Sequence, residues 1–499
     1  MESNTKKLWR CEICFQEFEG DEPPVPCPVC GADRDQFVEI TKEDSLKKNN
    51  KSISDGKEEG KKTRRWRCEV CFEEFEGDEP PVPCPVCGAG RESFVEITEE
   101  APESLINDIE QNIVIIGNGA AGYYAAKTIR EKSKAANITV ISSEEYLSYY
   151  RPQVSAYLSM EKLEDNMFIS DKSWYENNKI HLLLGKTVSK INISNKTVVL
   201  PNGQAISYDK LILANGSKSF ILPVKGIEKS NVFTLKDIKD ADNIKAAMVK
   251  AKDAVVIGGG LLGLEAAWEL KQNGLNVTVV EFMPSLLARQ LDEDGAKIFK
   301  KFVDATGINV LLGESTEEIL GSDSVEGVKL QSGKVIKAEI VLFSVGIRPN
   351  KEIADNTEIN ANKGIIVNDK METNIKDIYA CGDIAELNGR VYGNWPASIE
   401  MGKVAGSNAL GLSVIFKDFV SSTIYEGMNI KMFSCGDINP SYKNLEIKDS
   451  ENKFLQKLFF KDELLVGGYI LGDTSSSQNI VKAIKNSITF DIAKKSILK

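Results

Sequence analysis

Residues 113–122 read IVIIGNGAAG, and residues 254–263 read AVVIGGGLLG. Each stretch is a short apolar run that leads into a G-x-G-x-x-G loop. A lone loop of this kind is a weak signal, but each copy here lies between a predicted strand and a predicted helix. The expected elements are strands at 112–116, 138–141, 254–257 and 277–280 and helices at 120–132 and 261–273. This order requires parallel sheets covered by helices, and it predicts two dinucleotide-binding α/β units.

The three glycines of each loop have different expected roles. The first permits a tight turn, the second lets the backbone approach a pyrophosphate, and the third allows close packing of the helix. In chain order these residues are Gly117, Gly119 and Gly122 in the first loop, and Gly258, Gly260 and Gly263 in the second.

An acidic residue ends the second strand of each unit. Glu144 follows ITVISS, and Glu281 ends VTVVE. We expect both carboxylates to accept a hydrogen bond from a ribose hydroxyl, and Glu281 to repel a 2′-phosphate, so that NADH is preferred to NADPH. The next arginine, Arg289, lies eight positions beyond Glu281. The alternative is that each acid is a solvated strand end.

Eight of the ten cysteines form two copies of one motif, Cys-x-x-Cys, twelve residues and Cys-x-x-Cys. Two such hairpins facing each other supply four thiolates in a tetrahedron, which suits zinc or a single iron ion. The spacing does not choose between these metals. The expected ligands are Cys11, Cys14, Cys27 and Cys30 in the first copy, and Cys68, Cys71, Cys84 and Cys87 in the second.

The two cysteine motifs belong to a direct repeat, residues 9–41 and 66–98, offset by 57 positions. We call these segments module 1 and module 2. The segment 42–65 between them is charged and poor in apolar residues, which predicts a solvated linker. Such a coil would span roughly 25–30 Å. A second, shorter linker is expected at 99–110, so each module can swing towards a surface elsewhere on the chain.

The chain has a formal net charge of −11, and both modules are acidic. Each carries two arginines against eight acidic residues within 8–40 or 66–97. Acidic modules argue against nucleic acid as a partner, because its phosphates would repel them. They fit docking onto a basic patch of a protein. The alternative is that this charge serves solubility alone.

Paired cysteines in a long chain favour metal binding in a reducing compartment over a disulfide framework. The opening residues, MESNTKKLWR, lack the apolar run of a secretory signal. No stretch reaches the roughly 20 apolar residues that a membrane span needs. We therefore expect a cytoplasmic protein with no membrane partner.

Each module resembles rubredoxin, in the short form found at the end of rubrerythrins. The resemblance rests on the cysteine spacing, on Trp9 or Trp66 before the first pair, and on CPVCGADRDQFVEI in module 1. It implies iron, one ion per module, cycling between ferric and ferrous. The family usually has glycine after the second cysteine, where Phe15 and Phe72 stand here. The aromatic residues of each module are expected to form its small core; they are Trp9, Phe15, Phe18 and Phe37 with their repeat partners. The alternative is a zinc ribbon that acts as a rigid docking unit.

Further motifs resemble the flavoprotein pyridine-nucleotide reductases over about 111–499. They are LILANGS (211–217), FSVGIRPN (343–350) and IYACGDIAE (378–386). The resemblance implies that the first glycine loop binds FAD, that the second binds NADH, and that the NADH domain is inserted within the FAD domain.

Two more motifs narrow the resemblance to NADH:rubredoxin oxidoreductases and their relatives. They are YYRP (149–152) and GNWPASIEMGKVAG (393–406). By this resemblance Asp383 contacts the flavin ribitol, Arg151 neutralises the FAD pyrophosphate, and Trp395 lies near the isoalloxazine. Gly216 joins the residues expected at FAD, and Gly346 joins those expected at NADH.

Disulfide reductases of this superfamily carry one or two cysteines shortly after the first glycine loop, yet residues 117–165 contain none. Cys381 and Cys435 are expected to be buried packing residues, and the only histidine, His181, an ordinary strand residue. No side chain is expected to act as a catalytic acid, base or nucleophile. The electrons of the reduced flavin then need an acceptor other than a cysteine pair, and we expect the metal centres of the fused modules to be that acceptor.

The predicted fold class is multidomain: two small, mostly β, rubredoxin-like modules, an α/β flavoprotein reductase with two dinucleotide sites, and a C-terminal α+β domain. A strand at 464–471 and a helix at 478–487 are expected in that last domain. The expected boundaries are 1–41, linker 42–65, 66–98, linker 99–110, FAD-binding 111–222 and 343–412, NADH-binding 223–342, and C-terminal 413–499.

The leading functional hypothesis is an FAD-dependent NADH:rubredoxin oxidoreductase with two fused iron centres. The electrons would go on to a redox partner protein such as a flavodiiron protein or a rubrerythrin, serving oxygen, nitric oxide or peroxide detoxification in an anaerobe. One alternative is an NADH oxidase or peroxidase whose modules are structural zinc docking domains. Another is a regulatory protein whose flavin only senses NADH.

Overall fold

The computed structural model describes residues 7–11, 17–20, 22–25, 34, 37–40, 64–97, 108–449 and 454–496. The chain divides into two compact units, Met1–Lys62 and Thr63–Lys499.

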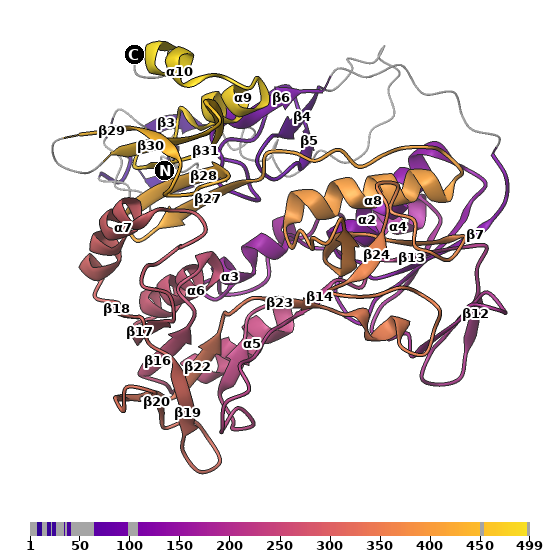
Figure 1. Cartoon of the computed structure of the whole chain (residues 1–499), viewed down its shortest axis with the longest axis horizontal. Helices are drawn as coiled ribbons and strands as arrows, with labels where there is room; N and C mark the ends of the chain where they lie inside the picture. Colours follow the sequence, from indigo (N-terminus) through magenta and orange to yellow (C-terminus); the bar gives the residue numbers. More distant parts are fainter. Residues whose placement is uncertain are drawn as a thin grey trace, which may run out of the picture. The chain divides into compact units, whose positions relative to one another are not determined.

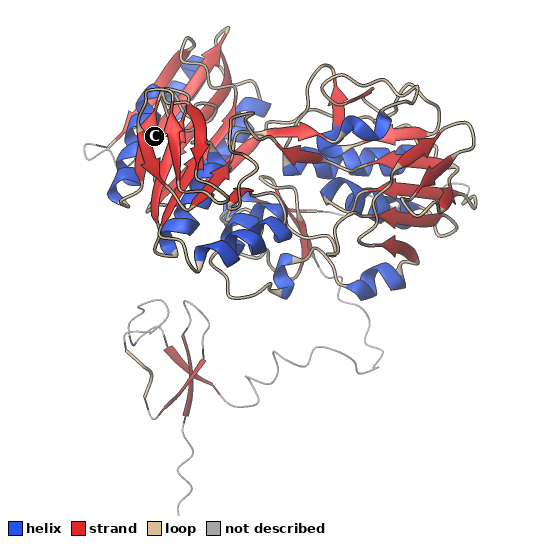
Figure 2. Cartoon of the chain, turned by 90° about the horizontal axis from the view of Figure 1, so that it is seen from below, coloured by secondary structure: helices blue, strands red, loops and turns tan. Residues whose placement is uncertain are grey.

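The first unit contains a three-stranded antiparallel sheet in the order β2-β1-β3, drawn as crossing arrows in Figure 2. Its strands are β1 (Lys7–Cys11), β2 (Glu17–Gly20) and β3 (Phe37–Ile40). Trp9 pairs with Phe18, and Cys11 at the end of β1 pairs with Phe37. The other three expected ligands, Cys14, Cys27 and Cys30, lie outside the described residues, as does Phe15.

Module 2 opens the second unit and repeats this sheet in the same register. Trp66 pairs with Phe75, and Cys68 pairs with Phe94, each 57 positions beyond its counterpart in module 1. The elements are β4 (Arg65–Cys68), β5 (Glu74–Glu76), the 3₁₀ turn η2 (Arg91–Ser93) and β6 (Phe94–Glu96).

The first dinucleotide unit is a five-stranded parallel sheet in the order β25-β13-β7-β8-β9. Strand β25 follows the second dinucleotide unit in the sequence yet pairs with β13, so the chain leaves this sheet and returns to it. The strands are β7 (Asn112–Ile116), β8 (Asn137–Ile141), β9 (Ile180–Leu183), β13 (Lys210–Leu213) and β25 (Ile378–Ala380).

Two long helices cover this sheet. Figure 1 shows α8 (Trp395–Ala409) lying along α2 (Ala120–Lys132). Their close approach depends on glycine, because a Cβ at Gly402 would lie 2.3 Å from the carbonyl oxygen of Ala121. The short helices α3 (Val154–Tyr157) and α4 (Lys172–Asn177) precede β9.

The second dinucleotide unit repeats the arrangement with the parallel order β15-β22-β16-β17-β18. Its strands are β15 (Val232–Thr234), β16 (Asp253–Ile257), β17 (Asn276–Glu281), β18 (Asn309–Leu312) and β22 (Ile340–Phe343). Its helices are α5 (Ile238–Met248), α6 (Leu261–Gln272) and α7 (Glu293–Ala305).

Four short sheets accompany the two dinucleotide units. They are the antiparallel β10-β11-β12 (Lys190–Asn192, Thr197–Val199, Ala205–Ser207), the antiparallel β19-β20-β21 (Thr316–Leu320, Gly327–Leu330, Val335–Lys337), and the pairs β14-β23 (Ser217–Ser219, Ile347–Pro349) and β24-β26 (Ile365–Val367, Ala385–Leu387).

The C-terminal region is an antiparallel sheet in the order β27-β28-β31-β30-β29, with α9 (Ser477–Lys485) against it and α10 (Phe490–Ser496) at the end. Buried Lys457 on β30 joins this sheet to α7, with its Nζ 2.5 Å from the carboxylate of Asp292. The strands are β27 (Ser422–Gly427), β28 (Ile430–Gly436), β29 (Lys443–Lys448), β30 (Leu455–Lys461) and β31 (Leu464–Leu471).

Within the described part of the chain, no helix is both long and apolar enough to cross a membrane.

Candidate functional site

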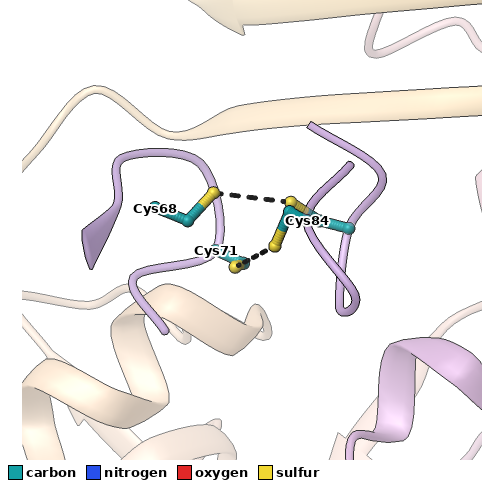
Figure 3. A group of neighbouring side chains, drawn as sticks. Cys68, Cys71 and Cys84 are labelled. Atoms are coloured by element: carbon teal, nitrogen blue, oxygen red, sulfur yellow. Dashed lines mark hydrogen bonds between the residues drawn. The ribbon is translucent and has the colours of Figure 1, made fainter. Parts of the chain in front are cut away.

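The four cysteines of module 2 converge on one point. The Sγ atoms of Cys68, Cys71, Cys84 and Cys87 all lie within 4.8 Å of one another, and three of these side chains are buried. The Cys68–Cys87 and Cys71–Cys84 sulfur pairs are 3.7 and 3.6 Å apart (Figure 3). A tetrahedron with metal–sulfur bonds of about 2.3 Å has edges of about 3.8 Å, so this donor set fits one zinc or iron ion.

Phe72, after the second cysteine, adopts a conformation that normally belongs to glycine. Its φ is +65°, close to the +72° of Gly88 at the equivalent point of the other hairpin. The left-handed region costs a residue with a Cβ about 1 kcal/mol. The ring packs against Phe419, with centroids 4.8 Å apart. The predicted module core is therefore right for Trp66, Phe75 and Phe94 but wrong for Phe72, which packs on the reductase.

Glu73 anchors module 2 at the junction of α2 and α8. Its side chain is 1% exposed and accepts hydrogen bonds from the Tyr124 hydroxyl at 2.5 Å and from Trp395 Nε1 at 2.8 Å. Burial raises the pKa of Glu73 to about 7, and the two hydrogen bonds limit the rise. Glu73 belongs to module 2, whereas both donors belong to the first dinucleotide unit, so the module is held by a buried polar contact.

Ion pairs surround this anchor. Glu74 lies 3.0 Å from Lys403 Nζ on α8, and Glu69 lies 3.2 Å from Lys485 Nζ on α9. Burial opposes ionisation of Glu74, but the positive charge of Lys403 prevails and lowers its pKa to about 2. The acidic charge of module 2 therefore meets basic side chains of its own chain. We call the dock the reductase residues whose side chains hydrogen-bond to, pair with or stack on side chains of the module: Tyr124, Trp395, Lys403, Phe419, Gln478 and Lys485.

A large cavity is lined in part by module 2. Its volume is about 2860 Å³, several times the roughly 300–1,000 Å³ of a pocket for one small ligand. Both glycine loops line it, and so do Cys71 and Cys87 of the candidate metal centre. Trp395 and Arg151 line it as well, while Tyr150 packs against Trp395 with ring centroids 6.3 Å apart.

The first and third glycines of each loop pack directly against backbone carbonyl groups. A Cβ at Gly117 would lie 2.2 Å from the Ala214 carbonyl oxygen, and one at Gly258 would lie 2.3 Å from that of Ser344. The third glycines are equally confined, because Cβ atoms at Gly122 and Gly263 would meet the carbonyl of the first glycine of each loop. A Cβ at Gly260 would meet nothing, so the middle of that loop is open.

Unpartnered buried polar atoms support a cofactor at the first loop. Asn118 is 6% exposed, and its Nδ2 atom has no partner, as is true of Asn215 Oδ1; both residues line the cavity. Gly216 lines it at φ +64°, and Gly346 does so at φ +104° beside the second loop. A dinucleotide would supply hydrogen-bond partners to these amides, so the residues present fit FAD.

The other residues expected at FAD lie around the same cavity. Arg151 forms an ion pair with Glu144 beside the first loop, and its Nε would be 3.9 Å from a Cβ at Gly119. Asp383, in η6 (Gly382–Ile384), accepts a hydrogen bond from Ser217 at 2.7 Å. The structure therefore brings Glu144, Arg151 and Asp383 together.

Glu281 lies at the end of β17, where the sequence places it, and lines the cavity. Its carboxylate accepts hydrogen bonds from the Gly259 and Met283 amides at 2.5 and 2.6 Å. These contacts fix the carboxylate beside the second loop, where a ribose hydroxyl would reach it.

Sequence reasoning missed two ionisable residues of the cavity. Glu265 on α6 accepts a hydrogen bond from Ser155 at 3.0 Å, and burial raises its pKa to about 7. Lys236 donates to Ser217 at 2.6 Å, and burial lowers its pKa. A carboxylate two positions after Gly263, within the apolar helix LLGLEAA, was a usable signal for Glu265. Lys236 lies in an ordinary TLKD segment that gave none. Cys381 and Cys435 are buried, as predicted.

Comparison with known proteins follows the same division of the chain. A family model described as pyridine nucleotide-disulphide oxidoreductase matches residues 111–402. One described as rubredoxin NAD+ reductase C-terminal domain matches 422–488. The rubredoxin-like domain of rubrerythrin matches twice, at 9–38 and 66–95.

Individual relatives agree. The chain is 34% identical over 379 residues to an NADH-rubredoxin oxidoreductase of Clostridium acetobutylicum, covering 76% of this chain and 96% of that protein. A crystal structure with that name and source superposes with a TM-score of 0.66 over 77% of this chain and 97% of that one. A nitrite reductase of Bacillus subtilis is 37% identical over 394 residues, which are 78% of this chain but only 49% of that protein. The chain thus spans about half of this longer relative.

The chain belongs to the pyridine nucleotide-disulphide oxidoreductase family, and the multidomain fold class predicted from the sequence is confirmed. Within that family of oxidoreductases it is a homologue of NADH-rubredoxin oxidoreductase, extended at its N-terminus by two rubrerythrin-type rubredoxin-like domains.

Proposed function

We propose that the protein is an FAD-dependent NADH:rubredoxin oxidoreductase that carries its own one-electron acceptors. The observation that carries this proposal is the lining of one cavity by both glycine loops and by Cys71 and Cys87. A metal ion held by module 2 would lie at the wall of the cavity in which FAD and NADH would bind.

FAD would lie along the first loop. Gly117 and Gly119 line the cavity and offer the pyrophosphate a close backbone approach, and Arg151 offers it a positive charge. Gly122 lets the helix pack closely against the loop. Glu144 would accept from the adenosine ribose, and Asp383 from the ribitol. FAD, when bound, supplies acceptance of a hydride from NADH and release of its electrons singly.

NADH would lie along the second loop, with Gly258 and Gly260 at its pyrophosphate and Gly263 allowing close packing of the helix. The carboxylate of Glu281 accepts from a 2′-hydroxyl and repels a 2′-phosphate, which favours NADH over NADPH. The open space at Gly260 leaves room for the phosphates.

Each module would hold one iron ion through four thiolates. Such an ion has no open position for a substrate, so the final acceptor is another protein. A flavodiiron protein or a rubrerythrin fits, in a role of oxygen, nitric oxide or peroxide detoxification. The competing function is an NADH oxidase or peroxidase whose modules hold structural zinc, because the tetrathiolate geometry suits both metals.

Anaerobic stopped-flow mixing with NADH, together with metal quantification, tests the proposal. We expect about two iron ions per chain and loss of colour at both in a single turnover. The repeat supplies matched variants, C68S/C71S in module 2 and C11S/C14S in module 1. Because module 2 lines the cavity, reduction of the remaining iron should slow at least tenfold in the first variant and keep its rate in the second.

Zinc in place of iron would favour the oxidase alternative. Iron that stays oxidised after NADH has reduced the flavin would contradict electron transfer to the modules. Equal rates in the two variants would contradict the role given to module 2.

A further inference from the structure

The two modules are nearly identical, so their differences are informative. Over 33 aligned positions they differ at five. Written with the module 1 residue first, these are Ile13 and Val70, Gln16 and Glu73, Asp33 and Gly90, Asp35 and Glu92, and Gln36 and Ser93.

Three of the five differences have little consequence at the dock. Glu92 is exposed. A Cβ at Gly90 would meet only the Glu92 side chain, which is free to move away. Val70 is buried in an apolar cluster that includes Tyr150 of the reductase, and isoleucine adds only a single methylene to it. The remaining two, Glu73 and Ser93, form side-chain hydrogen bonds with the reductase.

At the first contact, the Glu73 carboxylate accepts one hydrogen bond on each of its two oxygens, which the glutamine amide of module 1 does not do. Trp395 Nε1 is a donor only, and the Tyr124 hydroxyl donates as well, so Glu73 must accept twice. Glutamine offers one oxygen acceptor, and its NH2 group would face the Tyr124 hydroxyl. That hydroxyl could accept from the NH2 group only by turning its own proton away from this contact, which leaves the proton without a partner. Glutamine also lacks the charge that Lys127 and Lys403 face, both 5.5 Å from the Tyr124 ring centroid. An unpaired buried donor costs more than a hydrogen bond contributes.

At the second contact, a small residue makes room. Ser93 in η2 is fully buried, and its hydroxyl is 3.4 Å from Gln478 Nε2 on α9. Module 1 has glutamine at this position. Three additional side-chain heavy atoms in a packed contact force neighbours apart, which disfavours the bulkier module.

We propose that Glu73 and Ser93 make the dock selective for module 2 over module 1. Glu73 is the attractive element, and the larger Gln36 of module 1 is the repulsive one, the two means by which interfaces discriminate. The other contacting side chains, Glu69, Phe72 and Glu74, have identical counterparts in module 1 and do not discriminate. This inference rests on the proposed function. Its consequence is that module 2 stays docked and receives electrons from the flavin, whereas module 1 transfers electrons to the partner protein.

Zero-length carbodiimide cross-linking of the full-length, iron-loaded, oxidised protein tests the selectivity. The reagent joins carboxylates to amines in contact, so Lys403 should couple to Glu74 and Lys485 to Glu69. Mass spectrometry separates these products from those of Glu17 and Glu12 in module 1. We expect module 2 products to exceed module 1 products at least tenfold in the wild type.

The exchange variant Q16E/Q36S/E73Q/S93Q should lower this ratio at least tenfold. A second variant, Q16E/Q36S, leaves module 2 untouched and should lower it at least threefold, which keeps the test valid if the exchange variant folds poorly. The matched control D35E/E92D exchanges a difference outside the dock and should leave the ratio unchanged.

A smaller change in both test variants would overturn the proposal and assign the preference to the linkers. No NADH is present, so the outcome does not depend on electron transfer, which the stopped-flow experiment tests separately. Iron content and the visible spectrum show that both metal centres remain intact in each variant.

Discussion

Phe72 shows how one residue links a metal hairpin to a docking surface. The left-handed conformation that it shares with Gly88 is unfavourable for a side chain, yet it directs the ring to Phe419 on the reductase. The contact offsets the conformational cost only while the module is docked. Phe15 holds the same place in module 1.

Replacing Phe72 by glycine should weaken docking while leaving the metal centre intact. Glycine removes the backbone cost of about 1 kcal/mol, and it also removes the aromatic contact with Phe419, which contributes about 0.5–1.5 kcal/mol. The yield of the Glu74–Lys403 cross-link should fall several-fold with metal content unchanged. Phe15→Gly is the control and should not change that yield. An unchanged yield in Phe72→Gly would show that the ring does not contribute.

Glu265 should make stability depend on pH. Its pKa in the folded chain is about 7, above its ordinary value, so the folded state favours the protonated form. The stabilisation is complete below about pH 4 and is lost as the pH rises through 7, by at most about 3 kcal/mol. Urea unfolding midpoints should therefore fall between pH 5 and pH 8 in the wild type, and fall less in Glu265→Gln.

Exposed Glu161 supplies the control for this measurement, since Glu161→Gln should keep the wild-type pH profile. The same profile in Glu265→Gln would mean that the Glu265 carboxyl does not carry the effect.

At the scale of elements, the dock depends on how closely two helices approach. Tyr124 lies on α2, and Trp395 and Lys403 lie on α8, so the spacing of these helices sets the positions of three dock residues. Gly402 and Gly406 face the backbone of α2 at Ala121 and Ala125.

Gly402→Ala should therefore destabilise both the helix pair and the dock. The new Cβ would lie 2.3 Å from the Ala121 carbonyl oxygen, and forced overpacking of this kind costs about 1–3 kcal/mol. Gly406→Ala, with a corresponding distance of 2.7 Å, should cost less. Urea unfolding and the cross-link yield measure both effects, and equal stability of Gly402→Ala and wild type would refute the argument.

Elements follow from the sequence far better than contacts between them. The strand and helix predicted at 112–116 and 120–132 coincide with β7 and α2, because apolar runs and glycine punctuation are local signals. The helix predicted at 478–487 lies at Ser477–Lys485. The dock was invisible because Glu73 meets Tyr124 and Trp395 across 51 and 322 positions. From the sequence we predicted that the acidic modules dock onto a basic surface of a protein. The sequence did not indicate that this surface belongs to the same chain. The exact domain boundaries and the roles of the site residues stay predictions.

At the scale of the molecule, two regions of the reductase contact module 2, and a third is joined to one of them. Residues of module 2 contact α2 and α8 of the first dinucleotide unit and α9 of the C-terminal region, and Lys457 ties that region to α7 of the second dinucleotide unit. Module 2 is thereby connected to the first dinucleotide unit and the C-terminal region directly, and to the second dinucleotide unit through the C-terminal region.

Metal removal should release this arrangement. Four thiolates within 4.8 Å of one another need a cation between them, and small metal modules unfold without it. We expect hydrogen exchange to rise in Trp395–Ala409 and in Ala120–Lys132 when the metal is removed by acid and chelator. Zinc should restore protection, because it accepts the same tetrahedron. Unchanged exchange in the metal-free protein would show that the dock does not require a folded module.

Because module 2 is covalently part of the chain whose dock it fills, its encounter with the reductase is unimolecular. Module 2, the first acceptor in the proposed function, is present at one copy per enzyme, whatever the concentration of free electron carriers. Diluting the protein a hundredfold should leave the rate of that internal step unchanged, while the handover to an outside protein slows in proportion to concentration.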